Sequence, residues 1–206
     1  MPRRKFGSAM TGRYLNEHEV QRSKKLQRAQ ALGARNALSA ETRSARSDIV
    51  SQKLLQHPAV LQASVILSYM AFGAELDLAD FHSAIAKEGK TLAFPVTFGK
   101  GHMEAYQPLA DDAWSVDAAG IRSPEVERSL FIEPGTIDVV IVPCVAFDAG
   151  GWRMGWGGGH YDRYLPRCPK AHLIGVAFEV QRVDSVVVIP GRDIRLDEVM
   201  TEAESP

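Results

Sequence analysis

The stretch IDVVIVPCVAFDAGGWRMGWGGGHYDRYL (residues 137–165) gives the clearest indication of the fold. Its first part, residues 137–147, is almost continuously apolar, as is typical of a strand that a sheet buries on both faces. Six glycines then fall between Gly150 and Gly159, and a short helix is expected at about residues 161–165. A buried strand followed by a glycine loop and a helix predicts an α/β architecture.

The alternation of strands and helices continues on both sides of this stretch. Short apolar, β-branched runs predict strands at residues 64–70, 91–96, 103–108, 172–178 and 185–190. Helical patterns predict helices at about residues 20–38, 39–57 and 77–89, and residues 107–135 are expected to form long loops with a short helix. Alternating elements of this kind predict an α/β fold with a mainly parallel central sheet flanked by helices.

Length and composition fit one globular domain. The chain has 206 residues, of which 45% are hydrophobic, so it can bury a full core. We assign the domain to residues 21–206 and expect residues 1–20, which show no clear apolar period, to form a flexible extension. The formal net charge of −1 gives no indication of a nucleic-acid partner or of an anionic membrane surface.

The sequence also lacks the usual signals for a membrane or secreted location. No apolar run approaches the ~20 residues of a membrane helix, and the basic N-terminus lacks the apolar segment of a signal peptide. The two cysteines, Cys144 and Cys168, are too few for a disulfide framework or a cysteine metal cluster. Because reduced thiols are typical of the cytoplasm, we expect a cytoplasmic protein.

The glycine loop has the composition of a phosphate site. Ligands of open α/β sheets bind beyond the carboxyl ends of strands, where this loop falls. Glycines let the backbone approach a ligand, and successive N–H groups then form an anion-binding nest, helped by the positive end of the following helix. Arg153 can add a bidentate donor for phosphate, and Asp162 can bind a Mg²⁺ ion held by that phosphate.

A glycine-rich turn that only packs tightly is the competing interpretation. The loop matches neither standard nucleotide pattern. A P-loop requires a Lys-Ser/Thr pair after the glycines, and none is present. The spacing G-x-G-x-x-G also fails, because residue 160 is His.

The longer stretch PCVAFDAGGWRMGWGGGHYDRYL (residues 143–165) resembles the signature of the 5-formyltetrahydrofolate cyclo-ligase family, also called 5,10-methenyltetrahydrofolate synthetases. Five further segments resemble the family: KKLQRAQALGARNALSAETR, ILSYMAFGAELDL, GKTLAFPV, IGVAFEVQ and RDIRLDEVMTE. The resemblance covers residues 22–202, and several ordered motifs are far more specific than one glycine loop.

The resemblance implies a reaction, a fold and an assembly. ATP and Mg²⁺ drive the cyclisation of 5-formyltetrahydrofolate, with or without a polyglutamate tail, to 5,10-methenyltetrahydrofolate, with release of ADP and phosphate. The formyl oxygen attacks the γ-phosphate, and N10 then attacks the activated carbon. The implied fold is that of sugar-phosphate isomerases and CoA transferases (NagB/RpiA-like), and the family suggests a monomer.

The resemblance also implies roles for individual residues. The ATP-binding residues would be Lys24, Arg28, Arg153, Gly155, Gly157, Gly158, Gly159 and Tyr161, with Arg153 and Lys24 acting in catalysis. The substrate-binding residues would be Met70, Glu75, Trp156, Gly157, Gly158, Gly159 and His160. The metal ligands would be Asp162 and Asp193.

Each role has a structural alternative. Lys24 and Arg28 can belong to a solvated basic face that also includes Arg35, and Asp193 can pair with Arg192 or Arg195. The alternatives for the other residues are an exposed turn for Glu75, the core for Met70 and Tyr161, and a first-turn helix acid for Asp162. Trp114, which could cover a folate, is better explained as a half-buried loop aromatic.

The sequence departs from the family pattern within the glycine motif at His160, which replaces the first of two tyrosines, and conservatively at Met154. Two other functions compete with the cyclo-ligase reaction. A non-catalytic relative would bind folate or nucleotide as a regulator, but it need not keep Lys24, Arg28, Arg153 and Asp162 together. A sugar-phosphate isomerase or CoA transferase would need its own acid–base pair or acyl acceptor, and the sequence shows no such signature.

Overall fold

The computed structural model describes residues 17–99, 101–117 and 120–204. The helices are α1 (Glu17–Asn36), α2 (Ala40–Leu55), α3 (Pro58–Gln62), α4 (Ala79–Lys87) and α5 (His160–Tyr164), with 3-10 turns η1 (Val126–Arg128), η2 (Pro134–Thr136), η3 (Leu165–Arg167) and η4 (Glu179–Gln181). The strands are β1 (Val65–Leu67), β2 (Thr91–Thr97), β3 (Met103–Pro108), β4 (Trp114–Val116), β5 (Arg122–Pro124), β6 (Ser129–Ile132), β7 (Val139–Pro143), β8 (Ala146–Phe147), β9 (Arg153–Met154), β10 (His172–Val176) and β11 (Glu198–Met200).

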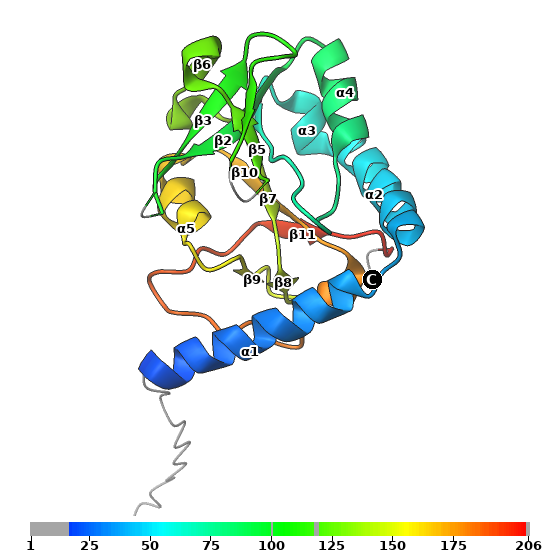
Figure 1. Ribbon diagram of the computed structural model, residues 1–206, viewed down its shortest axis with the longest axis vertical. Coiled ribbons are helices and arrows are strands. Elements are labelled where there is room, and N and C mark those ends of the chain that lie inside the picture. Colours follow the sequence, from blue (N-terminus) through cyan, green and yellow to red (C-terminus); the bar gives the residue numbers. More distant parts are fainter. Residues whose placement is uncertain (1–16, 100, 118–119, 205–206) are drawn as a thin grey trace, which may run out of the picture.

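A seven-stranded sheet in the order β11-β10-β7-β1-β2-β3-β6 forms the centre of the molecule (Figure 1). The five strands from β11 to β2 run parallel, whereas β3 and β6 add to the edge in antiparallel pairing. The hairpins β4–β5 and β8–β9 stand outside this sheet. The prediction of an α/β fold with a mainly parallel central sheet is confirmed.

Strand β7 lies at the centre and is buried on both faces. Val139 and Ile141 point into the core cluster that includes α2 and α4. Val140 and Val142 point into the cluster on the opposite face, which includes the α5 region. All four side chains are fully buried. The alternation follows from the two-residue period of a strand, and it explains why this part of the sequence is continuously apolar.

The predicted strand of residues 137–147 is interrupted after Pro143. Strand β7 ends there, and β8 begins at Ala146. The buried side chain of Gln181 donates to the carbonyl oxygens of Cys144 (2.7 Å) and Val145 (2.9 Å), so it replaces strand pairing at the break. The chain can then turn out of the sheet toward the glycine loop.

The strand predicted at residues 185–190 is not present. The N–H groups of Val186 and Val187 donate to side chains, namely Asp148 Oδ2 (2.8 Å) and Gln27 Oε1 (3.1 Å). Because side chains take these donors, the segment packs as a coil against α1 and β8. The parallel edge strand is instead β11, which pairs with β10.

The structure also corrects the predicted N-terminal extension and the predicted loops of residues 107–135. Helix α1 begins at Glu17, so residues 17–20 belong to the helix, and the rest of the predicted extension lies outside the described residues. Residues 107–135 contain β4, β5, β6 and the turn η1 rather than long loops alone. Among the described helices, none combines the length and apolar character that a membrane span needs.

Helix α1 lies apart from the helices that cover the sheet faces, and it crosses beneath the hairpin β8–β9 (Figure 1). Its buried residue Ala31 packs in a small cluster with Ala146 of β8, Met154 of β9 and Val186. This packing places one face of α1 beside the segment that follows β9. That segment is the glycine loop.

Candidate active site

The loop from Gly155 to Gly159 joins β9 to α5, and its backbone donors are unpaired. Among the described residues, no group accepts a hydrogen bond from the N–H groups of Gly155, Trp156, Gly157, Gly158 or Gly159. Gly157 and Gly159 have φ values of +106° and +68°, which side chains rarely permit. Successive unpaired N–H groups in a loop with such residues form the kind of concavity that binds anions.

The helix after the loop contributes little to this cradle. It was predicted at about residues 161–165 and is found as the single turn α5 (His160–Tyr164). So short an element has only a weak macrodipole. Among backbone groups, the loop N–H groups rather than the helix therefore supply most of the positive potential.

Helix α1 adds two cations to the loop. Arg28 donates from Nε to the carbonyl oxygen of Gly155 (2.9 Å), and its guanidinium would lie 3.3 Å from a Cβ placed on Gly157. Lys24, one turn earlier, forms an ion pair with Asp193. The alternative partners that the sequence suggested for Asp193, Arg192 and Arg195, do not pair with it among the described contacts. The two cations are thus directed to the site rather than to solvent.

Asp162 and Asp193 are held in the same way. Asp162 Oδ1 accepts from Arg153 Nη2 (2.8 Å) and from the Ile194 N–H (3.1 Å). Asp193 Oδ2 accepts from Lys24 and from the Ile189 N–H (2.7 Å). The second oxygen of each carboxylate accepts no hydrogen bond from a described group. An oriented carboxylate with one free oxygen is a suitable donor for Mg²⁺.

Arg153 is placed differently from the prediction of a phosphate-binding cation. Its side chain is buried, and both terminal nitrogens are occupied, because Nη1 donates to the carbonyl oxygen of Ile194 and Nη2 to Asp162. The guanidinium therefore links the strand before the glycine loop to the late loop that carries Asp193. In this structure it orients a carboxylate and does not face open space.

Glu75 and Trp156 meet on the other side of the loop. Trp156 donates from Nε1 to Glu75 Oε1 (2.8 Å), and the Phe72 N–H donates to Glu75 Oε2 (3.0 Å). The Trp156 ring also contacts Phe72 edge-on and is 51% exposed. The sequence predicted both Glu75 and Trp156 for the substrate, and the structure brings them together.

Arg35 belongs to this group, and the sequence analysis assigned it only to a basic face. Its guanidinium is 4.0 Å from Glu75 and 5.3 Å from the centre of the Trp156 ring. The residue is 3% exposed, and Nε has no hydrogen-bond partner among the described groups. Burial lowers the pKa of Arg35, while the Glu75 carboxylate opposes that shift. A buried donor without a partner is uncommon and points to a ligand.

A sequence signal for Arg35 did exist. Lys24, Arg28, Ala31 and Arg35 follow one another at intervals of four, three and four residues. Such spacing puts all four on one face of a helix. Because Ala31 is buried, this face is turned toward the protein and not toward solvent.

Three further predicted residues lie at the margin of the site. Met70 packs against the core cluster on the α2 side of the sheet, and Tyr161 packs against the cluster on the other side. The Tyr161 hydroxyl is buried without a described partner, and burial raises its pKa. The His160 ring lies where a Cβ on Gly158 would clash, and burial together with Arg163 lowers its pKa.

Trp114 takes no part in this arrangement. It contacts Phe94 edge-on, with ring centres 4.9 Å apart, and Arg122 stacks over its ring. Trp114 is half-buried, as expected, but it is the first residue of strand β4 and does not lie in a loop. Cys144 is buried, which raises the pKa of its thiol to about 12, so it is not a reactive nucleophile.

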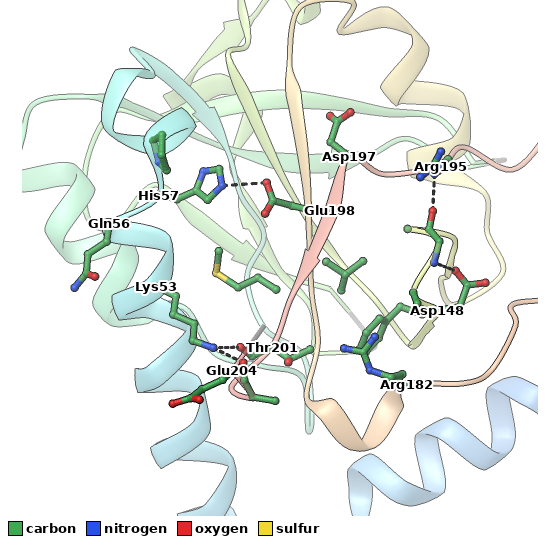
Figure 2. A pocket seen from close by; sticks show the side chains of 18 residues that line it. Lys53, Gln56, His57, Asp148, Arg182, Arg195, Asp197, Glu198, Thr201 and Glu204 are labelled. Carbon is green, nitrogen blue, oxygen red and sulfur yellow. Dashed lines mark hydrogen bonds and ion pairs between the residues drawn. The ribbon is translucent and has the colours of Figure 1, made fainter. Parts of the chain in front are cut away.

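The glycine loop does not line the cavity of about 700 Å³ that Figure 2 shows. That cavity is bounded by the turn between β8 and β9, by β11 and by the end of α2. The loop itself is mostly exposed and lies beyond the carboxyl end of β7.

Comparison with known proteins shows the family of the chain. The model of the 5-formyltetrahydrofolate cyclo-ligase family matches residues 20–202. The 5-formyltetrahydrofolate cyclo-ligase of Mus musculus is 27% identical over 201 residues, which cover 91% of this chain and 97% of the mouse protein. The enzyme of that name from Escherichia coli K12 is 28% identical over 174 residues, or 82% of this chain and 95% of the bacterial protein.

Two solved structures share the fold. The 5,10-methenyltetrahydrofolate synthetase of Aquifex aeolicus has a TM-score of 0.77 and 32% identity, covering 88% of this chain and 90% of that one. The synthetase of Mycoplasma pneumoniae has a TM-score of 0.71 and 22% identity, covering 87% and 99%, and so supports the fold alone. With the family match over most of its length, the chain belongs to the 5-formyltetrahydrofolate cyclo-ligase family.

Proposed function

We propose that this chain catalyses the ATP-dependent cyclisation of 5-formyltetrahydrofolate to 5,10-methenyltetrahydrofolate, with release of ADP and phosphate. The observation that carries the proposal is the row of unpaired N–H groups from Gly155 to Gly159, flanked by Lys24 and Arg28. A row of donors with two cations suits a phosphate chain. The family relation identifies the second ligand as the folate.

The chemistry requires positioning and charge neutralisation. A formyl oxygen is a poor leaving group, so it first attacks the γ-phosphate, and N10 then attacks the activated carbon as phosphate departs. Phosphoryl transfer of this kind depends mainly on alignment and on donors aimed at the transferring oxygens. The loop N–H groups and Arg28 supply such donors. Lys24 has three N–H donors, so it can keep Asp193 and still reach a phosphate oxygen.

Asp162 and Asp193 are the residues that would hold Mg²⁺. Each has one oxygen fixed by a cation and a backbone N–H, and the other oxygen free of described partners. Mg²⁺ held there would neutralise part of the charge of a phosphate chain. Arg153 acts as a positioning residue in this proposal, because it orients Asp162 and ties the late loop to β9.

Glu75 and Arg35 together fit the polar edge of a pterin ring. That edge carries adjacent N–H donors next to a carbonyl oxygen. The Glu75 carboxylate would accept from the N–H groups, and the unpaired Nε of Arg35 would donate to the carbonyl. Trp156 now occupies Glu75 Oε1, and since it is half exposed it can swing away and stack on the incoming ring.

Three finer points belong to the same proposal. The sheet is expected to be of the sugar-phosphate isomerase and CoA transferase (NagB/RpiA-like) kind. The chain is expected to act as a monomer and to accept substrate with or without a polyglutamate tail. Both cysteines are buried and free, which is compatible with a cytoplasmic enzyme.

The test is a spectroscopic assay with a matched pair of variants. Purified protein is mixed with 5-formyltetrahydrofolate, ATP and Mg²⁺, and the near-ultraviolet absorbance of the methenyl product is followed. We expect product only when all three are present, a loss of about hundredfold or more in Lys24→Met, and little change in Lys25→Met, since Lys25 is exposed. A folded protein that binds both ligands without forming product would indicate a non-catalytic relative.

A further inference from the structure

We propose that His57, His172 and Glu198 form a binding site for a transition-metal ion of the Zn²⁺ class, separate from the glycine loop. One ligand atom from each residue, the two imidazole nitrogens and a carboxylate oxygen, lies within 4.8 Å of the others. The residues come from three elements. His57 precedes α3, His172 is the first residue of β10, and Glu198 is the first residue of β11.

The distances between these ligand atoms are such that only a small rearrangement is needed for an ion to enter. His57 Nε2 is 3.0 Å and His172 Nε2 is 2.6 Å from Glu198 Oε1, and the two rings are stacked with centres 5.6 Å apart. Around a tetrahedral Zn²⁺ with bonds of about 2.0–2.1 Å, neighbouring ligand atoms are about 3.4 Å apart. A small outward movement of the Glu198 carboxylate therefore opens the space. Two imidazoles with one carboxylate suit Zn²⁺, Co²⁺ or Ni²⁺ better than Mg²⁺ or Ca²⁺.

A carboxylate, the usual supporting partner of a metal-bound imidazole, lies near His172. Its second nitrogen, Nδ1, faces Asp197 Oδ2 at 3.6 Å. Asp197 is itself anchored, because Oδ2 accepts the Leu173 N–H (2.8 Å). At 3.6 Å the contact is longer than a hydrogen bond, so Asp197 has to approach slightly before it accepts the Nδ1 proton and leaves the lone pair of Nε2 for the ion.

His57 binds at a cost. Its Nδ1 accepts the Ala59 N–H (3.2 Å) and so caps α3. Coordination through Nε2 moves the proton of the neutral ring to Nδ1, and this hydrogen bond is lost. The loss of one neutral hydrogen bond lowers the affinity by about tenfold. It also gives a signature, because the Ala59 amide proton should exchange faster in the metal-loaded protein.

His57 and Glu198 line the cavity of about 700 Å³, and the His172 side chain, which does not line it, is itself 38% exposed. Figure 2 shows His57 and Glu198 facing each other on its wall, and Asp197 immediately precedes β11. The side chain of His57 is 16% exposed and that of Glu198 is 39% exposed. An ion can therefore enter, and water can complete the coordination. Once bound, it would link the edge strand β11 to β10 and to the junction of α2 and α3.

The location separates this site from the proposed catalysis. His172 and Glu198 stand at the amino ends of parallel strands, whereas the glycine loop lies beyond the carboxyl end of β7. Cyclo-ligase activity should therefore persist when the metal site is removed. Failure of the metal proposal would leave the proposed function untouched, and the reverse also holds.

The test uses the untagged full chain titrated with Co²⁺ and then with Zn²⁺. We expect one equivalent of Co²⁺ with visible bands of four-coordinate geometry, displacement by Zn²⁺, and a raised Tm. Glu198→Gln keeps an acceptor for both imidazoles but is a poor metal ligand, so it should lower the affinity at least tenfold, as should His172→Gln. His102→Gln is the matched control, because His102 Nε2 lies 3.0 Å from Glu104 Oε1 without a second imidazole.

The outcomes separate cleanly. Equal affinity in the chain, in Glu198→Gln and in His102→Gln would overturn the proposal and show only scattered surface binding. So would the absence of a stoichiometric site in the unsubstituted chain. If His172→Gln fails to fold, Glu198→Gln and the exchange rate of the Ala59 amide still decide the question.

Discussion

The two glycine clusters of residues 150–159 differ in whether their backbone N–H groups are paired. In the turn between β8 and β9, the Gly150 N–H donates to Asp148 Oδ1 (2.9 Å) and the Gly151 N–H to the Asp148 carbonyl oxygen (3.2 Å). Four residues after Gly151, the N–H groups from Gly155 to Gly159 donate to no described group. Both clusters look alike in sequence, but the N–H groups of one are paired within the fold and those of the other have no described partner.

Asp148 explains why the first cluster is closed. Its side chain also accepts the N–H groups of Trp152 (3.2 Å) and Val186 (2.8 Å), and the residue is 7% exposed. Glycine at position 151 is required because φ is +79° and a Cβ would lie 2.7 Å from the Leu196 carbonyl oxygen. The contrast teaches that glycine content alone does not indicate a ligand site, whereas the fate of each N–H group does.

The largest effect should come from opening the closed cluster. Asp148→Ala removes the acceptor of three backbone N–H groups, so we expect the free energy of unfolding to fall by about 3–5 kcal/mol. Urea unfolding measures the change, with the exposed Asp111→Ala as control. A loss below about 1 kcal/mol would mean that this turn is not held by its carboxylate.

The largely buried side chain of His82 should make the stability of the fold depend on pH. His82 Nε2 hydrogen-bonds to Ser68 Oγ (2.7 Å), and burial lowers its pKa to about 4 from 6.5. The unfolded chain therefore binds this proton first as the pH falls, and stability is lost between pH 6.5 and about 4. The shift corresponds to about 3 kcal/mol.

His82→Gln should remove that part of the pH dependence, because an amide can bond to Ser68 without titrating. Urea unfolding at a series of pH values measures the slopes, with the exposed His102→Gln as control. Parallel slopes for the unsubstituted chain and His82→Gln would contradict the assignment.

Substitutions in the unpaired cluster, Gly155 to Gly159, should change activity rather than stability. Gly157→Ala forces a side chain into φ +106° beside the Arg28 guanidinium, so we expect kcat/KM to fall by about hundredfold. Gly155→Ala is the matched control, since a Cβ there meets nothing within 4 Å and φ is not positive, and it should stay within about threefold. Equal losses in both variants would break the distinction between positions within the loop.

The side chain of Arg35 also carries a buried donor, Nε, without a described partner. If its unpaired Nε serves the folate, Arg35→Met should raise KM for 5-formyltetrahydrofolate by about tenfold and leave KM for ATP nearly unchanged. Arg22→Met, on an exposed face of α1, is the control. A rise in both KM values, or a fall in kcat alone, would indicate that Arg35 only supports the structure.

The sequence predicted those parts of the molecule that local pattern determines. The buried strand β7, the glycine loop and the helices α1, α2 and α4 follow from apolar period and glycine spacing, whereas α3 (Pro58–Gln62) was not predicted. Strand β11 was missed because Asp197 and Glu198 hide the pattern of an edge strand that is only half buried. The strand expected at residues 185–190 was wrong because the side chains of Asp148 and Gln27 capture its N–H groups.

The sequence predicted which residues belong to the candidate site better than it predicted which groups their side chains contact. The resemblance supplied Lys24, Arg28, Glu75 and Asp162, but it could not show that Arg153 is fully occupied or that Lys24 pairs with Asp193. Arg35 was assigned to a solvated face because charge alone suggested solvent. Tertiary packing of α1 across the β8–β9 hairpin decides these contacts, and that packing is not local in sequence.

Backbone amide signals give the most direct test of the loop assignment. A ¹⁵N-labelled sample would be titrated with Mg²⁺ and a non-hydrolysable ATP analogue, and the amide resonances of both glycine clusters followed by NMR. We predict large shifts and slowed hydrogen exchange from Gly155 to Gly159, with Gly150 and Gly151 nearly unchanged. Saturable binding that leaves Gly155 to Gly159 unmoved would contradict the account.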